Sequence, residues 1–167
     1  MIVRPMIEAD LEALMLLAGA TPEAPSWDRA AYHSFLNSVP GPSSGIFIAE
    51  IAGDLAGFIA SQITLDICEL ESIAVAPRYR RDGVGSALLA ALTAWAYESR
   101  VLKIQLEARS ANHSAISFYE RRGFRRDGLR RGYYRRPEDD AVLMSLTLPE
   151  AFLAGVFASR NFPQNQH

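Results

Sequence analysis

A glycine-rich turn between a β-type segment and a long apolar helix limits the fold of this 167-residue chain more than any other feature. The turn follows the run Glu69–Val75, and its residues are Arg80, Arg81, Asp82, Gly83, Val84, Gly85 and Ser86. A largely apolar helix is expected from Val84 to Ser99. The run Ile104–Ala108 then alternates apolar and polar residues, as a strand with one buried face does. Strand, helix and strand in this order predict a crossover connection within one sheet.

Two helices and an antiparallel hairpin are expected before the turn. Asp10 and Ser26 are the expected N-terminal caps of the helices, and Gly19 stops the first of them. The tripeptide Ala-Gly-Asp at 52–54 is typical of a hairpin turn. The helices are predicted over residues 11–18 and 27–37, and the hairpin strands over residues 46–51 and 55–65.

A short helix and two further strands are expected after the crossover. Gly123 suits the left-handed conformation that commonly ends a helix. The expected ranges are 114–122 for the helix, 124–129 and 141–148 for the strands, and 150–159 for a last helix after Pro149. The resulting order, ααβββαβαββ, predicts an α/β fold with a mixed, mostly antiparallel sheet and helices on both faces.

Length and composition indicate one domain. A chain of this size can bury one sizeable core, and we expect a single domain over residues 1–148, followed by a helix and a polar tail over 149–167. The single cysteine, Cys68, excludes an intramolecular disulfide. The longest apolar run, Gly83–Tyr97, is too short to span a bilayer, and the first ten residues do not resemble a signal peptide. We therefore expect a cytoplasmic protein without membrane contact.

Charge is distributed unevenly along the chain. Residues 1–77 carry ten acidic and two basic side chains, whereas residues 78–167 carry fifteen basic and nine acidic ones. This separation indicates that one half binds an anion and the other a cation, and two solvated faces without a partner are the alternative. The three histidines lack the spacing of a metal site, so no metal is expected.

The glycine-rich turn has the chemistry of a diphosphate site. Gly83 and Gly85 allow the backbone to turn tightly, so that its N–H groups converge where the positive end of the helix dipole points. Arg78 and the two arginines of the turn add positive charge. A Walker loop would need a lysine after the second glycine, and a dinucleotide fingerprint would need a third glycine where Leu88 stands. A turn that merely connects strand to helix is the alternative.

Segments on both sides of the turn form an ordered series with it. They are Ile73–Pro77, Leu106–Asn112, Phe118–Phe124, Arg131–Tyr134 and Glu138–Met144. In this order they resemble the GNAT superfamily of N-acetyltransferases, and the turn resembles its coenzyme A loop, R/Q-x-x-G-x-G/A. The sequence of these segments is similar to one branch of the superfamily, the RimI-like ribosomal-protein alanine N-acetyltransferases. The similarity covers residues 45–148 and implies an acetyl-CoA-binding core there, while residues 1–44 match poorly and would form the acceptor-side helices.

The resemblance implies that acetyl-CoA is the cosubstrate and which residues hold it. The pantetheine arm would pair with the backbone of Ile73, Ala74 and Val75, and the turn from Arg80 to Ser86 would hold the diphosphate. Asn112 would contact the coenzyme, although by its sequence position alone it is a turn or helix-cap residue. Eight arginines lie between Arg121 and Arg136. We expect them to contact the 3′-phosphate of the coenzyme or solvent, and we expect no nucleic acid, because the sequence pI is about 5.9 and no matching motif is present.

The resemblance also implies the catalytic groups. Glu107 would be the general base for the amine, and Tyr119 would be the general acid for the departing thiolate. Glu71 is the alternative base, because it lies on the strand before the loop and shares a face with Glu69. From the residues alone, Glu107 reads as part of a solvated strand face and Tyr119 as core packing.

The acceptor is the least determined part of the function. We expect the N-terminal α-amine of a protein, of the ribosomal-protein alanine type, because such an amine with a pKa of about 8 costs roughly 1 kcal/mol to neutralise at pH 7, against roughly 4–5 kcal/mol for a lysine. The alternatives are a small-molecule amine, such as a polyamine, an amino acid or an aminoglycoside, and a non-catalytic acetyl-CoA sensor. A homodimer is compatible with the terminal extension.

Overall fold

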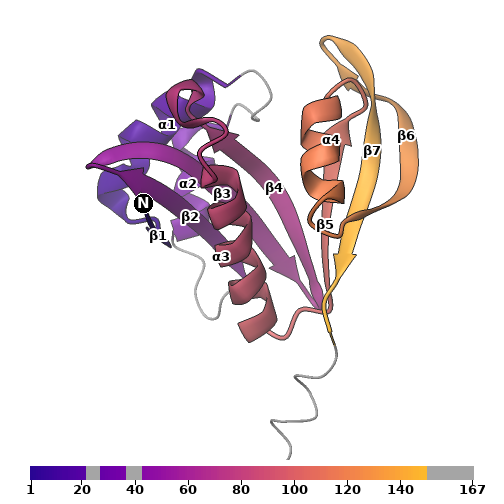
Figure 1. Cartoon of the computed structure of the whole chain (residues 1–167), viewed down its shortest axis with the longest axis horizontal. Helices are drawn as coiled ribbons and strands as arrows, with labels where there is room; N and C mark the ends of the chain where they lie inside the picture. The colour runs from indigo at the N-terminus through magenta and orange to yellow at the C-terminus, as the bar shows by residue number, and fades with distance from the viewer. Residues whose placement is uncertain (22–26, 37–42, 150–167) are drawn as a thin grey trace, which may run out of the picture.

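The computed structural model describes residues 1–21, 27–36 and 43–149. In these ranges the chain forms a sheet of seven strands in the order β1-β2-β3-β4-β5-β7-β6 (Figure 1). Every neighbouring pair is antiparallel except β4 and β5, which are parallel. The strands are β1 Ile2–Pro5, β2 Ser44–Ile51, β3 Asp54–Thr64, β4 Ile67–Val75, β5 Lys103–Arg109, β6 Arg125–Arg135 and β7 Glu138–Thr147. The predicted mixed, mostly antiparallel sheet is confirmed.

Helices cover both faces of the sheet, as predicted. Adjacent residues of β3 show this, because successive side chains of a strand point to opposite faces. Phe58 and Ala60 are buried in one core with residues of α1, and Ile59 is buried in a second core with residues of α3 and α4. The helices are α1 Leu11–Gly19, α2 Arg29–Leu36, α3 Val84–Glu98 and α4 His113–Glu120, with single 3₁₀ turns η1 Glu8–Asp10 and η2 Pro77–Tyr79.

The elements expected around the glycine-rich turn are present. The crossover connects β4 to β5 through α3. Ile104, Leu106 and Ala108 of β5 are buried and the residues between them are partly exposed, which confirms the predicted alternation. The hairpin of β6 and β7 is longer than expected, because two register shifts in β6 let its polar, arginine-rich residues continue the pairing.

Two expectations at the N-terminal end are wrong. Strand β1 was not expected, since its short polar sequence has no alternation, and it is held by pairing with β2. The side chain of Asp10 does not cap α1, because its carboxylate pairs with Arg4 and accepts a hydrogen bond from the backbone N–H of Ile7. The cap of α2 is Asp28, whose Oδ1 accepts from the backbone N–H of Ala31 at 2.8 Å. The expected cap Ser26 and the helix predicted over 150–159 lie outside the described residues.

Strands β4 and β5 diverge, and this divergence positions the site. They pair only from Ile67 to Leu70, against Lys103 to Leu106, although both strands continue further (Figure 1). Glu71 begins the unpaired part, and it is also a bulge against β3, because Ala60 lies opposite Ser72 and Ser61 opposite Leu70. A bulge re-aims the side chain it carries. The divergence therefore leaves one edge of the β4 backbone free beyond Leu70.

Candidate active site

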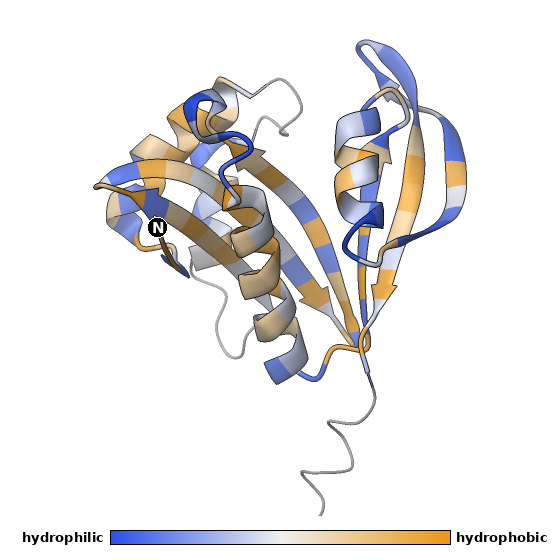
Figure 2. Ribbon diagram, viewed as in Figure 1, coloured by the Kyte–Doolittle hydropathy of each residue, from blue (hydrophilic) through white to orange (hydrophobic). Residues whose placement is uncertain are grey.

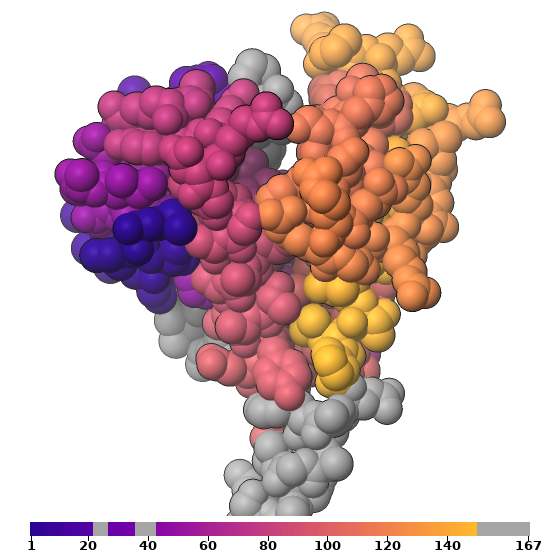
Figure 3. All heavy atoms as spheres, in the orientation of Figure 1, coloured from indigo at the N-terminus to yellow at the C-terminus, as the bar shows by residue number. Residues whose placement is uncertain are grey.

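A pocket of about 740 Å³ lies between the turn before α3 and helix α4, and we call it the α3–α4 pocket. In Figure 3 the surface is hollowed between these two parts of the chain. The sequence-predicted residues that line this pocket are Ile73, Ala74, Val75, Arg80, Arg81, Gly83, Val84, Gly85, Ser86, Asn112 and Tyr119. Asp82 does not line it. Nearly all residues implied as coenzyme contacts thus surround one cavity.

The turn presents free backbone N–H groups to this pocket. Gly83 precedes α3 with a left-handed φ of 82°, and no side chain caps the first turn of the helix. A Cβ on Gly83 would meet no atom within 4 Å, so this position requires the conformational freedom of glycine rather than its small size. Because the first N–H groups of a helix have no partner within it, the start of α3 can bind an anion.

Arginines are distributed unequally around the turn. Arg80, Arg81, Arg121 and Arg122 line the α3–α4 pocket. Figure 2 shows the same hydrophilic character in the segment before α3 and at the C-terminal end of α4. Arg78, expected to add charge to the pocket, instead forms an ion pair with Asp54 at 3.0 Å and is not part of the lining.

Asn112 and Tyr119 come to the pocket from α4. The side chain of Asn112 caps α4, because its Oδ1 accepts from the backbone N–H of Ala115 at 3.0 Å. Tyr119 packs against Phe118 and Phe124, and burial raises the pKa of its phenol well above the usual range. Both residues have the structural roles that sequence position alone suggested. Both also face the cavity, so a contact with a bound molecule is sterically open to them.

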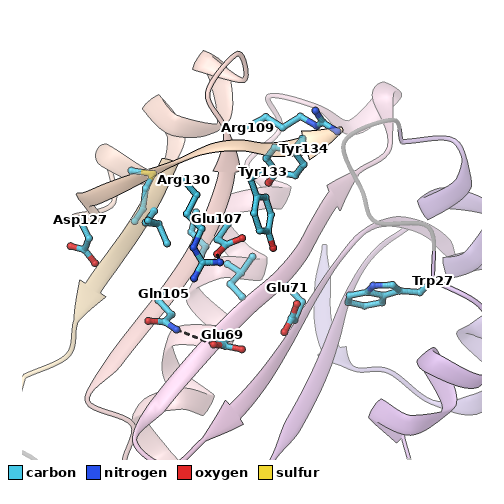
Figure 4. A pocket seen from close by; sticks show the side chains of 14 residues that line it. Trp27, Glu69, Glu71, Gln105, Glu107, Arg109, Asp127, Arg130, Tyr133 and Tyr134 are labelled. Carbon is cyan, nitrogen blue, oxygen red and sulfur yellow. Dashed lines mark hydrogen bonds and ion pairs between the residues drawn. The ribbon is translucent and has the colours of Figure 1, made fainter. Parts of the chain in front are cut away.

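A second pocket, of about 780 Å³, lies beside the paired parts of β4 and β5, and we call it the carboxylate pocket (Figure 4). Its carboxylates are Glu69 and Glu71 from β4, Glu107 from β5 and Asp127 from β6. The remaining side chains include Trp27, Arg130 and Tyr133. The predicted base and its alternative therefore share one cavity, and the shared face of Glu69 and Glu71 is confirmed.

The three glutamates of this pocket have different partners. Glu107 Oε1 lies 2.5 Å from Arg130 Nη1, and a hydrogen bond with Glu107 raises the pKa of the Tyr133 phenol. Glu69 accepts a hydrogen bond from Gln105 at 2.9 Å. Partial burial, and then the negative charges of Glu69 and Glu107, raise the pKa of the Glu71 carboxyl. Glu71 is thus the carboxylate best suited electrostatically to take up a proton, and Glu107 is the one most firmly held.

The two pockets lie on successive segments of β4. Glu69, Leu70 and Glu71 line the carboxylate pocket, and Ile73, Ala74 and Val75 line the α3–α4 pocket. The unpaired edge of β4 runs between them. A molecule extended along this edge from the α3–α4 pocket would bring its end to the carboxylates.

Several lining residues were not assigned from the sequence. Tyr133 and Tyr134 lie in a segment that contributed to the resemblance, but they were given no role there. Trp27, just before α2, had no assigned role. Arg130 of β6 is one of the arginines expected to contact the 3′-phosphate or solvent, and it instead pairs with Glu107 in the carboxylate pocket. No local pattern marks such residues, because only the tertiary fold brings them together.

Two negative findings apply to the described ranges. There, His, Cys, Asp and Glu side chains form no group of three that could hold a metal ion. Among the same residues, no helix combines the length and apolar character needed to cross a bilayer.

A divergent mixed sheet, with an uncapped helix start at one pocket and carboxylates at another, fits an enzyme that transfers an acyl group from a coenzyme thioester to an amine. Residues 11–124 match the family model described as Acetyltransferase (GNAT) family, and the chain belongs to this family. It is an acetyl-CoA-dependent N-acetyltransferase.

Known relatives agree with this assignment. The chain is 39% identical over 98 residues to the [ribosomal protein bS18]-alanine N-acetyltransferase of Escherichia coli (strain K12), a match covering 58% of this chain and 66% of the relative. A crystal structure of the Escherichia coli ribosomal-protein-S18-alanine N-acetyltransferase superposes with a TM-score of 0.78 at 31% identity, covering 90% of this chain and 95% of the other. An N-alpha-acetyltransferase of Sulfurisphaera tokodaii is 32% identical over 130 residues, covering 70% of this chain and 77% of the relative.

Proposed function

We propose that this enzyme acetylates the N-terminal α-amine of a protein, of the ribosomal-protein alanine type. The observation that carries the proposal is the pair of pockets at the divergence of β4 and β5, one with uncapped helix N–H groups and the other with four carboxylates. The names of the relatives support the choice of acceptor. The carboxylate pocket is large enough for the first residues of a peptide and carries the negative charge that a cationic terminus requires.

The chain's own residues would hold acetyl-CoA along β4. The first turn of α3 would bind the diphosphate through its N–H groups. Beyond Leu70 the edge of β4 that faces β5 is unpaired, so Ile73, Ala74 and Val75 can accept the pantetheine amides as an added strand would be accepted. Arg80 Nε now donates to the carbonyl of Val75 at 3.3 Å, and this contact would be exchanged for one with the pantetheine arm. The thioester would then lie next to Glu71 and Glu107.

The acceptor amine must lose a proton before it can attack the thioester carbonyl. We assign this proton to Glu107, which Arg130 and Tyr133 hold toward the pocket, with Glu71 as the alternative base. A carboxylate is a sufficient base for an α-amine, because converting the ammonium form of such an amine to its neutral form at pH 7 costs only about 1 kcal/mol.

The departing thiolate must gain a proton, and we assign this step to Tyr119. Its side chain is buried and lines the α3–α4 pocket. The raised pKa keeps the phenol protonated at neutral pH. The raised pKa also makes the phenol a weaker acid, so its proton passes less readily to the thiolate. We therefore expect proton donation by Tyr119 to assist acyl transfer without limiting its rate.

The proposal is tested by following thiol release from acetyl-CoA with two sets of acceptors. One set contains peptides that begin with Ala, Ser or Met, and the other contains polyamines, amino acids and aminoglycosides. We expect turnover with the peptides, highest with N-terminal Ala, and none with the metabolites. Turnover with metabolites alone would refute the protein acceptor, and coenzyme binding without any turnover would identify a sensor.

A further inference from the structure

Arg122, directly after α4, is a half-buried cation without an acidic partner among the described residues. Its Nη1 donates to the carbonyl of Phe118 at 2.9 Å, and its Nη2 donates to Ser86 Oγ in the first turn of α3. The guanidinium carbon lies 3.7 Å from the centroid of the Phe118 ring. Three contacts therefore fix this charge at the wall of the α3–α4 pocket.

The surroundings of Arg122 leave its charge uncompensated. Burial and the neighbouring Arg121, which lines the same pocket, lower the pKa of the Arg122 guanidinium. A partly desolvated charge beside a like charge is unfavourable unless an anion compensates both. The bond to Ser86 and the stack on Phe118 hold the guanidinium in place without supplying that anion. The position is thus organised in advance for a negatively charged group of a ligand.

The ligand of this pocket carries more than one phosphate. The diphosphate is matched by the uncapped N–H groups at the start of α3. The guanidinium of Arg122 comes to Ser86 from the segment that follows α4. Coenzyme A carries one further phosphate, on the 3′-oxygen of its ribose, and this group would be the one left for α4 to bind.

We propose that Arg122, assisted by Arg121, forms a subsite for the ribose 3′-phosphate of coenzyme A and selects it over 3′-dephospho-coenzyme A. The inference rests on the proposed function only in requiring that the coenzyme binds in the α3–α4 pocket. Arg122 acts here as a specificity residue and takes no part in the acyl transfer.

A purely structural role for Arg122 makes a different prediction. A basic side chain that bonds the last carbonyls of a helix stabilises it without any ligand. In that case removing the guanidinium would lower the stability of the protein and would weaken both coenzymes by the same factor. A phosphate subsite instead changes the ratio of the two affinities.

The test is a calorimetric titration of the full chain with coenzyme A and with 3′-dephospho-coenzyme A. We expect the unmodified protein to prefer coenzyme A by at least about tenfold, as a charge-assisted contact to phosphate gives. Arg122→Gln should reduce this ratio to nearly one while leaving the affinity for the dephospho form unchanged. Arg122→Lys should give an intermediate ratio. Arg125→Gln, an exposed residue outside the pocket, should keep the full ratio.

The outcomes separate this inference from the proposed function. Binding of both coenzymes with equal affinity by the unmodified protein would overturn the subsite and leave the enzyme assignment intact. An equal loss for both coenzymes in Arg122→Gln would overturn it as well and would assign the residue to the turn or to the diphosphate. If Arg122→Gln proves unfolded by circular dichroism, Arg121→Gln must lower the ratio for the inference to stand. Failure of both coenzymes to bind the unmodified protein would instead refute the coenzyme pocket itself.

Discussion

At the scale of single residues, the neighbours of three glutamates in the carboxylate pocket give these chemically similar side chains different properties. Arg130 pairs with Glu107, and Gln105 donates to Glu69. Burial, and then the negative charges of Glu69 and Glu107, raise the pKa of Glu71. A catalytic base works best when its pKa approaches the working pH, but it must also be oriented. Glu107 has the orientation and Glu71 the raised pKa. The two requirements therefore point to different residues, and only their removal one at a time decides between them.

We expect Glu107→Gln to lower kcat/KM by about 10²–10³-fold and to abolish the acidic limb of its pH profile, since a general base contributes in this range. Glu71→Gln should cost much less and keep the limb. It should also raise the melting temperature at pH 7, because a carboxyl with a raised pKa opposes folding above that pKa and ceases to do so as the pH falls through it.

The measurement is the pH dependence of thiol release for the three variants Glu107→Gln, Glu71→Gln and Glu69→Gln. Glu69→Gln removes the same charge from the same pocket and shows what loss of charge alone does. If the acidic limb disappears in Glu71→Gln and persists in Glu107→Gln, Glu71 is the base and our assignment is wrong.

At the scale of elements, the sequence predicts what repeats locally and misses what depends on distant pairing. Helix α3 and strand β5 are predicted well, because their apolar periods are carried by consecutive residues. The divergence of β4 from β5 and the bulge at Glu71 have no such signal, since they depend on the registers of three strands. The pairing of Arg130 with Glu107 could not be predicted from the sequence for the same reason. The resemblance supplied the candidate residues, but not the two separate cavities in which they lie.

Gly57 of β3 illustrates an element contact that only the structure reveals. A Cβ at this position would lie 2.7 Å from the carbonyl oxygen of Ala74 and 3.1 Å from side-chain carbons of Val84 and Leu88. The backbone of β3 therefore touches β4 and the start of α3 directly. Any side chain here would push the turn before α3 away from β4.

We expect Gly57→Ala to destabilise the protein by about 1–3 kcal/mol, as overpacking does, and to weaken coenzyme A binding as well. Thermal unfolding and calorimetric titration measure the two effects. The matched control is Gly19→Ala at the end of α1, where a Cβ meets nothing within 4 Å and the backbone is unstrained. Equal melting temperatures for the two variants would contradict the close approach at Gly57.

At the scale of the whole molecule, the sheet has two parts joined by a narrow seam. Strands β1 to β4 carry α1, α2 and α3, and strands β5 to β7 carry α4 (Figure 1). Between the two parts of the sheet run four paired residues of β4 and β5. In addition, the buried side chains of α3 share one core with those of β5, α4 and β7, and Arg122 bonds Ser86 across the α3–α4 pocket. The two pockets differ in charge. Arginines are the charged side chains of the α3–α4 pocket, and in the carboxylate pocket four carboxylates outnumber Arg109 and Arg130.

A coenzyme bound in the α3–α4 pocket would contact both parts and should hold them together. At a concentration about 100 times its Kd, coenzyme A should stabilise the protein by about 2.7 kcal/mol and raise its melting temperature by roughly 5–10 °C. Mass action alone gives that shift wherever the coenzyme binds, so the decisive readout is amide hydrogen exchange. Slower exchange in α4 as well as in the turn before α3 is expected if the ligand joins the two parts, because local opening of α4 then requires loss of the ligand. Protection confined to the turn would show that α4 opens independently of the bound coenzyme and would contradict this prediction.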